Sequence, residues 1–475
     1  MPYKQGKAKK APATTGKRQE KVLLAETIGR TLCLRQTRLD RDNSCSERLH
    51  IPDPGQLFGS NSPASQWLSV PDQRLPGSAT ASSETLTTES RDSTLYNTSS
   101  APSRSDRHTS TECNASRTRI VSLKGTATAQ DAERLALEYG LPSQMGLLDP
   151  NYSIFINEQK SGGVCFKVLN KVAVVLGDPL CHSTQIPSLM ADFKLYRRQK
   201  RWGVSVLGAG KELVEYSAYT EEGTSTIVQF GHNRVLNPLT NEVIHETSGK
   251  RILTQNRQLL NPSKGGISLD IYTPSVHGTD YKLEWELSSI YHDWCIARNA
   301  TEKPQAFITE YDPFLMPTLM TYIYARNSHG TVLGFAALRW VGMKGGYHVD
   351  PCIAGPGARK GITDLLLFAS MAYLRQQGVS YLSVGYEPSE SLAGISGLPG
   401  PLAPLTDRLY QFTFHRLPIS GKRAYFDKFR PDDAQCEPVY LIFSSKLPRP
   451  RDVVAVAHAA NIKLRRLVFH GSPES

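Results

Sequence analysis

Residues 345–387 read GGYHVDPCIAGPGARKGITDLLLFASMAYLRQQGVSYLSVGYE and decide the fold. The stretch predicts a strand that breaks at Asp350-Pro351, followed by a glycine-rich basic loop over residues 355–361. Apolar residues spaced three and four apart between Ile362 and Tyr373 predict one stripe of a helix, and residues 379–386 predict a buried strand. This order of elements presents backbone N–H groups and two cations to a phosphate at a helix N-terminus.

A second stretch, residues 172–210, repeats this order of elements. It has an apolar strand ending at Asp178-Pro179, then a helix, then a Gly-Val-Ser strand entry at Gly203 that matches the entry at Gly378. Two related α/β units in tandem are one interpretation, and chance similarity between two short β-α-β runs is the other. The favoured interpretation predicts an α/β fold built from a duplicated unit.

The composition favours an anionic partner. The 475 residues are enough for two or three domains, and a hydrophobic content of 39% suits a globular protein diluted by a polar segment. A formal net charge of +11 is typical of proteins that meet nucleic acid or an acidic membrane surface. Charge alone does not choose between these two partners.

Cysteine usage and hydropathy indicate a reducing compartment and no structural metal. The eight cysteines are isolated, with no C-x-x-C pair and no zinc-ligand spacing. The longest apolar run, residues 365–374, is too short to span a bilayer, and no secretory signal is recognisable. We therefore expect a cytoplasmic protein with no transmembrane segment, whose contact with membranes is at most peripheral.

Shifts in composition predict three parts. Residues 1–117 are basic and rich in Ser and Thr, and they predict a disordered tail because such a segment buries too little apolar surface to offset chain ordering. Residues 118–262 and 263–475 predict the two α/β units, with a hinge at 261–266 and the active site in the second unit. Residues 398–405 predict a loop, and residues 409–414 and 439–444 predict strands that close the sheet.

A polar stretch, residues 230–260, carries three further cations. Thr247 or Ser248 is placed to cap a helix that bears Lys250, Arg251 and Arg257. These three side chains are either phosphate contacts or ordinary surface cations, and the pattern does not decide between the two.

Several separated motifs resemble one known family. They are Leu176-Gly-Asp-Pro-Leu180, Phe335-Ala-Ala-Leu338, the glycine loop with its helix, Leu382-Ser-Val-Gly385, Phe426-Asp-Lys-Phe-Arg-Pro431 and Glu437-Pro-Val-Tyr-Leu441. Over residues 118–460 the chain resembles the C-terminal aminoacyltransferase domain of bacterial phosphatidylglycerol lysyltransferases, the multiple peptide resistance factors. The resemblance implies two tandem acetyltransferase-like (GNAT) folds that transfer an amino acid from aminoacyl-tRNA to a lipid hydroxyl. It implies no cofactor, because the aminoacyl-tRNA donor is already activated.

Two tracts look like the fungal branch of this family, the ergosteryl-amino-acid synthases. They are Arg234-Val-Leu-Asn-Pro238 and Gly249-Lys-Arg-Ile-Leu-Thr-Gln-Asn-Arg-Gln-Leu-Leu260. The chain shows no synthetase domain or flippase and is similar to the freestanding type, which implies glycyl-tRNA as donor and ergosterol as acceptor. The bacterial family carries Asp-Leu-Met-Arg where this chain reads Asp350-Pro-Cys-Ile353. The missing arginine puts phosphatidylglycerol and lysine in doubt and fits a different acceptor or amino acid.

The implied transfer needs a counter-charge for the α-ammonium, a base for the acceptor hydroxyl and donors for the oxyanion. Asp350 is a candidate for the ammonium partner or the base, against a structural Asp-Pro turn. His348 shares its strand face and is a candidate proton relay, against a satisfied core or surface histidine. Glu387, at the end of the next strand, is a second ammonium candidate, whereas Asp178 in the first unit is interpreted as structural.

The transfer also needs a grip on the acceptor end of the tRNA. The glycine loop and the helix in the polar stretch supply the candidates for tRNA or phosphate binding: Gly357, Arg359, Lys360, Gly361, Lys250, Arg251 and Arg257. The sterol or phospholipid acceptor is expected in an apolar slot between the two units, where pockets commonly form.

Three functions stay open. The leading hypothesis is a tRNA-dependent acyltransferase that moves glycine to the 3-hydroxyl of ergosterol, with phosphatidylglycerol as the alternative lipid acceptor. The second is an acyl-CoA-dependent N-acyltransferase that uses the glycine loop for a pyrophosphate. The third is a non-enzymatic protein that binds RNA or membranes.

Overall fold

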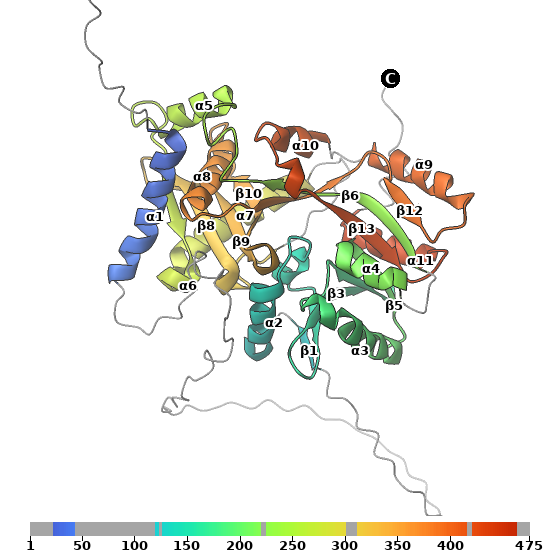
Figure 1. Cartoon of the computed structure of the whole chain (residues 1–475). Coiled ribbons are helices and arrows are strands. Elements are labelled where there is room, and N and C mark those ends of the chain that lie inside the picture. The colour runs from blue at the N-terminus through green and yellow to red at the C-terminus, as the bar shows by residue number, and fades with distance from the viewer. Residues whose placement is uncertain are drawn as a thin grey trace, which may run out of the picture. The chain divides into compact units, whose positions relative to one another are not determined.

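The computed structural model describes residues 22–42, 119–122, 126–219, 225–300, 311–415 and 420–462. Figure 1 shows the helices and strands that these residues form. The strands join into one mixed sheet, with helices packed against it (Figure 1).

Residues 119–236 contribute the first group of elements. Its strands are β1 (Arg119–Ser122), β2 (Ser153–Ile156), β3 (Gly163–Leu169), β4 (Val172–Leu176), β5 (Gly203–Ala209) and β6 (Thr226–Leu236). Its helices are α2 (Thr126–Tyr139), α3 (Ile186–Gln199) and α4 (Lys211–Tyr219), with short 3₁₀ helices η1 (Met145–Leu148) and η2 (Ser183–Gln185).

Residues 250–459 contribute the second group, and one further helix, α1 (Leu24–Asp42), precedes both. The strands are β7 (Ser268–Tyr272), β8 (Met320–Arg326), β9 (Val332–Val341), β10 (Gly346–Ala354), β11 (Leu382–Pro388), β12 (Gly394–Ser396) and β13 (Glu437–Phe443). The helices are α5 (Lys250–Leu260), α6 (Pro274–His277), α7 (Tyr281–Asn299), α8 (Ile362–Gln376), α9 (Leu402–Phe414), α10 (Ser420–Asp427) and α11 (Pro450–Ala459). The 3₁₀ helices are η3 (Pro317–Leu319), η4 (Gly342–Lys344) and η5 (Asp433–Gln435).

The order of strands reveals the duplication. Across the sheet it runs β1-β2-β3-β4-β5-β13-β6-β11-β10-β9-β8-β7, with β12 added beside β6. Along this path only β4·β5 and β10·β11 are parallel, so the pattern of directions reads the same from either edge. The last strand of each half pairs with the other half. β13, from the second half, lies beside β5 of the first, and β6, from the first half, lies beside β11 of the second. Neither half completes its part of the sheet alone.

The two parallel pairs differ in length. β4 and β5 stay paired over five residues, from Val172 opposite Gly203 to Leu176 opposite Leu207. β10 and β11 pair only at Tyr347–Leu382 and His348–Ser383. Immediately afterwards the register between β10 and β9 shifts between Val349 and Cys352. Both parallel ladders thus end two residues before the aspartate of an Asp-Pro pair, and the halves differ in the length of the ladder and in the irregular register beside Asp350.

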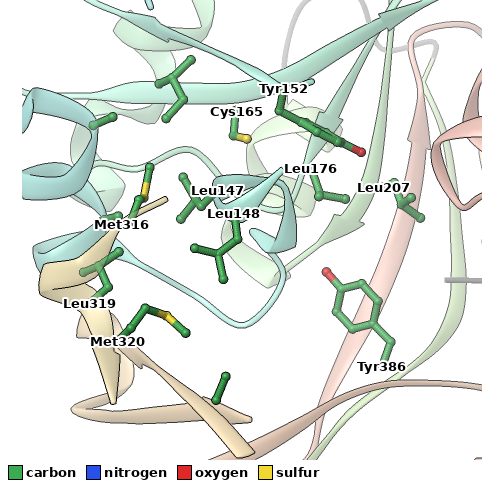
Figure 2. Packing of buried hydrophobic residues seen from close by; sticks show 14 of the residues in the cluster. Leu147, Leu148, Tyr152, Cys165, Leu176, Leu207, Met316, Leu319, Met320 and Tyr386 are labelled. Carbon is green, nitrogen blue, oxygen red and sulfur yellow. The ribbon is translucent and has the colours of Figure 1, made fainter. Parts of the chain in front are cut away.

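The hydrophobic core on one face of the sheet is shared by the two halves. Figure 2 shows ten of its residues, which come from both halves: Leu147, Leu148, Tyr152, Cys165, Leu176, Leu207, Met316, Leu319, Met320 and Tyr386. A second core lies beneath α8, whose residues from Leu365 to Leu374 are all buried. Burial of the predicted apolar stripe explains why this segment forms the central helix of its half.

Helix α1 corrects the prediction of a disordered tail over residues 1–117. Its Ala25, Ile28 and Leu32, spaced three and four apart, are buried against the core beneath α8. Arg35 pairs with Asp270 at 3.1 Å, and Tyr373 donates to Gln36 at 2.8 Å. The basic composition of the surrounding chain hid this short amphipathic stripe. The rest of the predicted tail, residues 1–21 and 43–117, lies outside the described residues.

Two further segments differ from the sequence-based expectations. Residues 398–405 were predicted as a loop, and residues 409–414 as a strand that closes the sheet. The structure instead has helix α9, which begins at Leu402 and ends at Phe414. The place of that strand is taken by β6, in a stretch for which only a helix was predicted. Leu402, Leu405, Leu409 and Phe412 follow helical spacing, which outweighs the local preference of Phe and Thr for strands.

We predict that Leu32→Ala lowers the free energy of unfolding by about 2–5 kcal/mol, because it empties a fully buried site between α1 and α8. Urea titration followed by circular dichroism measures the change. Leu34→Ala is the matched control: Leu34 lies on the same helix, is 57% exposed, and its truncation should cost less than about 0.5 kcal/mol. Equal effects of the two changes would contradict the docking of α1.

Candidate active site

Asp350 lies where β10 parts from β11, and a group of polar side chains surrounds it. The carboxyl is half-buried. Burial raises its pKa, and the neighbouring Lys422, Tyr311 and Arg339 act in the opposite direction. A carboxylate at this place thus has cations for neighbours and is not merely the acceptor of an Asp-Pro turn.

Lys422 reaches this group from α10. A Cβ on Gly385, whose φ is +88°, would lie 3.4 Å from both Lys422 Nζ and His348 Cε1. The lysine remains in contact with water, yet the surrounding protein lowers its pKa, with Asp350 and Glu387 opposing this effect. A Cβ at residue 385 would therefore be in ordinary van der Waals contact with both groups, and it is the left-handed backbone that favours glycine here.

His348 is buried, and its hydrogen bonds define the tautomer. Asn233 donates to Tyr381 Oη at 2.8 Å, which leaves its Oδ1 to accept from Ser383 Oγ at 2.7 Å. Ser383 has thereby used its one proton, so its contact with His348 Nδ1 at 3.2 Å requires the histidine to donate. The lone pair is therefore on Nε2.

That Nε2 has the properties of a base. Among the described residues it has no hydrogen-bond partner, although it is buried. Burial, together with Arg339 and Lys422, lowers the pKa of His348 well below its ordinary value. The imidazole is therefore neutral at physiological pH, and it offers an unoccupied lone pair beside Asp350.

Arg339 lies directly opposite His348, on β9. It is 1% exposed and donates through Nη2 to the carbonyl oxygen of Leu141 at 3.0 Å. Its Nη1 has no partner among the described residues. Burial lowers the pKa of the guanidinium to about 10, so it stays charged at neutral pH. A buried cation with an unused N–H is costly unless an anion or a polarised oxygen binds there.

Glu387 is held by two arginines. Arg234 Nη1 lies 3.3 Å from its carboxylate and Arg423 Nε also lies 3.3 Å from it. Arg234 in addition pairs with Asp427 at 2.6 Å. Since Arg423 and Asp427 belong to α10, these pairs fasten the helix that carries Lys422. The predicted role of Glu387 as an ammonium partner stays a prediction, next to this visible role in positioning α10.

The predicted phosphate-binding loop lies at the N-terminus of α8. Gly357 and Gly361 adopt φ values of +76° and +96°, which favour glycine, and Gly361 precedes the first turn of α8. Arg359 donates to the carbonyl oxygen of Lys264 at 2.7 Å. The carbonyl of Lys360 accepts from Gln255 on α5 at 2.8 Å, while its side chain is exposed. Within the described ranges, no hydrogen bond or ion pair links Arg359 or Lys360 to Asp350.

The exposed face of α5 lies beside this loop. Its residues line an open hollow of about 450 Å³: Lys250, Arg251, Thr254, Gln255 and Gln258. Lys250 and Arg251 therefore share the surface of α5 with the residue that contacts Lys360. Arg257 does not join them, because it pairs with Glu246 at 2.5 Å, which also accepts from the Leu24 backbone. The structure thus brings two of the three helix cations to the glycine loop.

Asp178 has different surroundings from Asp350. It follows β4 rather than lying within the strand, and it accepts from the Gly210 backbone at 2.8 Å. Burial raises its pKa to about 7. The ladder between β4 and β5 ends at Leu176, two residues before Asp178, and the contact with the Gly210 backbone then ties the Asp178 carboxyl to the residue that follows β5. Its interpretation as a structural group stays a prediction.

Sequence reasoning named Asp350 and His348 but missed Lys422 and Arg339. The signal for Arg339 is a lone charge inside the apolar strand VLGFAALRWV, which is unusual unless the charge has a use. Within the described ranges no group of His, Cys, Asp or Glu is arranged to hold a metal ion, and no helix is long and apolar enough to cross a membrane.

Comparisons with known proteins agree with this fold. Residues 142–443 match the family model described as phosphatidylglycerol lysyltransferase, C-terminal. Among solved structures, L-PGS from Bacillus licheniformis is 17% identical with a TM-score of 0.53, and covers 71% of this chain and 97% of its own. The C-terminal domain of a lysylphosphatidylglycerol synthetase from Agrobacterium fabrum is 16% identical with a TM-score of 0.52, and covers 70% of this chain and 96% of its own. A sequence comparison with curated proteins found no match.

The two structural matches and the mirrored strand order confirm the predicted α/β fold of tandem acetyltransferase-like units. The family model spans more than half of the chain. This chain therefore belongs to the phosphatidylglycerol lysyltransferase C-terminal family, and it is an acyltransferase.

Proposed function

We propose that the protein transfers an amino acid from aminoacyl-tRNA to the hydroxyl group of a membrane lipid. Membership of the family supports the donor and the class of acceptor. The observation that carries the proposal is that His348 Nε2 and Arg339 Nη1, on directly opposite residues of β10 and β9, are both buried and have no hydrogen-bond partner among the described residues, with Asp350 nearby. A base, an N–H donor and a carboxylate together are what transesterification of an aminoacyl ester requires.

The finer proposal names glycine and the 3-hydroxyl of ergosterol. It rests on the likeness of residues 234–238 and 249–260 to the fungal branch, and on Asp350-Pro-Cys-Ile353 in place of the bacterial Asp-Leu-Met-Arg. Arg234 from the first tract pairs with Glu387, and the second tract forms α5. Phosphatidylglycerol is the alternative acceptor that the experiment below compares directly.

The proposed reaction has two steps. The acceptor hydroxyl gives its proton to His348 Nε2 while its oxygen attacks the ester carbonyl, and the N–H of Arg339 Nη1 stabilises the oxyanion. Collapse then breaks the bond to the ribose oxygen of the tRNA, which takes the proton back from His348. Asp350 faces the α-ammonium of the amino acid. The products are the aminoacylated lipid and free tRNA, so no redox agent or nucleotide is consumed.

We predict that purified protein, glycyl-tRNA and ergosterol yield a labelled lipid, and that RNase treatment of the donor abolishes it. Thin-layer chromatography with mass spectrometry identifies the product, with phosphatidylglycerol as a parallel acceptor. Asp350→Asn should reduce the rate at least about 100-fold, because it removes the counter-charge of the ammonium. Asp178→Asn, the same change in the other half, should leave more than half of the rate.

The alternatives have distinct outcomes in this assay. Product that forms from acetyl-CoA and survives RNase would indicate an acyl-CoA-dependent N-acyltransferase. Product on phosphatidylglycerol but not on ergosterol would reject the sterol. Absence of any product with either lipid and every charged tRNA would contradict the proposed transfer.

We expect His348→Asn to lower kcat by about 10²–10⁴, because asparagine retains the donor to Ser383 but removes the base at Nε2. In the wild type, kcat/KM should fall at acidic pH as Nε2 becomes protonated, with a pKa below 6.5, and should be flat above it. Stopped assays across pH 5–8 measure this profile. The variant should lack the acidic limb, while His329→Asn, in an exposed turn, should keep it. An unchanged acidic limb in the His348 variant would assign the titration to another group.

The basic face of α5 predicts a defined salt effect. Replacing both Lys250 and Arg251 by alanine should weaken tRNA binding roughly tenfold or more and reduce the slope of log K against log salt by about 2, because two phosphate contacts are lost. Filter binding at several salt concentrations measures both. The double variant Lys282→Ala, Lys446→Ala removes the same charge from exposed positions outside this hollow and should alter neither quantity. Equal slopes for the two double variants would exclude α5 from the tRNA contact.

A further inference from the structure

Helix α9 carries a row of exposed apolar side chains. Leu405, Leu409 and Phe412 are 61%, 64% and 53% exposed. Their spacing of four and three residues places them on one stripe of the helix. None of the residues of α9, which Figure 1 labels beside β12, is buried, and these three apolar side chains are exposed to solvent.

The opposite side of α9 is firmly attached to the sheet. Tyr410 Oη donates to the carbonyl oxygen of Ser389 at 2.8 Å and lies 3.1 Å from the carbonyl oxygen of Phe230. Asp407 accepts from the backbone of Leu392 at 2.9 Å and from Gln411 at 2.8 Å. These hydrogen bonds fix which face of α9 points outward, so the apolar side chains keep a defined orientation at the surface.

α9 carries one cation, Arg408, which is exposed between Leu405 and Leu409. The one acidic residue of α9, Asp407, is engaged by Leu392 and Gln411. An apolar row with an exposed arginine beside it, on a helix whose other face is anchored, matches the interface of a bilayer that contains anionic lipid.

The surface is close to the candidate active site along the chain. Tyr410 is bonded to Ser389, two residues beyond Glu387, which corresponds to about 7 Å of extended chain. Arg423 of α10 contacts both Glu387 and Glu390, so the same segment holds α9 and the helix that carries Lys422. The α9 surface and α10 are therefore tied to one short segment, residues 387–390.

We propose that Leu405, Arg408, Leu409 and Phe412 form the surface by which the protein docks on anionic bilayers to reach its acceptor. The proposal rests on the proposed transfer to a lipid. The three apolar side chains enter the boundary between headgroups and acyl chains, about 5–10 Å deep, while the lipid hydroxyl stays at the surface. A second copy of the chain is a poorer occupant, since a stable dimer interface buries roughly 800 Å² on each partner, far more than three side chains provide.

Vesicle sedimentation tests the docking with the full chain, without tRNA or turnover. The protein should bind vesicles of phosphatidylcholine with 30% phosphatidylserine, and the triple variant Leu405→Ser, Leu409→Ser, Phe412→Ser should bind at least tenfold more weakly. Arg408→Glu should weaken binding to these vesicles and leave binding to pure phosphatidylcholine unchanged. The double variant Trp285→Ser, Ile296→Ser is the matched control, because these α7 residues are 70% and 55% exposed and lie outside the surface.

Insertion is measured separately, with Phe412→Trp and brominated lipids. Quenching of emission beyond that of the wild-type chain is expected if residue 412 reaches the acyl region, and equal quenching would overturn the proposal. Wild-type affinity of the triple variant for vesicles would overturn it too. The proposal would also be overturned if the wild-type chain did not bind vesicles but dimerised through α9, which sedimentation velocity would detect.

Two measurements distinguish a loss of docking from misfolding, and test docking independently of the proposed transfer. The triple variant should keep the wild-type thermal midpoint and the wild-type affinity for tRNA, which a misfolded chain would lose. Vesicle binding that depends on α9, combined with no transfer to any lipid, would reject the proposed function and leave the docking surface intact.

Discussion

The exchange of β6 and β13 at the centre of the sheet is the constraint on which the remaining structure depends. Without β13 the edge of β5 would be open, and without β6 the edge of β11 would be open, each with a row of unpaired backbone groups. The exchange fills both edges and binds the halves into one sheet. It also places Arg234 of β6 opposite Gly385 of β11, where it pairs with Glu387. A strand supplied by the first half thus becomes part of the site in the second.

Duplication leaves two halves that are alike in topology and unlike in use. β4 and β5 pair over five residues, whereas β10 and β11 pair over only two. Beyond the last of these two pairs, Asp350 lies near Lys422, and so does His348. A buried polar atom without a partner lowers stability, so each such atom calls for an explanation. His348 Nε2 and Arg339 Nη1 are two such atoms among the described residues, and the proposed transfer gives a use to both.

Sequence patterns within short segments predicted the elements that form from neighbouring residues. The strand, glycine loop and helix of residues 345–387 follow from spacing, and Asp350 and His348 were found because they lie two apart on one strand. Lys422 and Arg339 were missed because their place beside Asp350 depends on contacts between elements distant in sequence. Helix α1 was missed because a few buried residues are diluted by a basic, polar neighbourhood. Arg257 was grouped with Lys250 and Arg251 by composition, although it is engaged in an ion pair with Glu246.

Helix α10 joins the two surfaces that the proposed transfer requires. Just beyond its C-terminal end, Lys428 pairs at 2.6 Å with Asp364 in the first turn of α8, next to the glycine loop and the basic face of α5. Near its N-terminal end, Lys422 and Arg423 meet Asp350 and Glu387, on the segment that also anchors α9. Eight residues of helix span about 12 Å. A tRNA end held at α5 and a lipid presented at α9 would therefore approach the same carboxylate from the two ends of one short helix. In keeping with that arrangement, α10 is held by ion pairs of Arg423 with Glu387 and Glu390 and of Asp427 with Arg234, and Lys428 just beyond it pairs with Asp364.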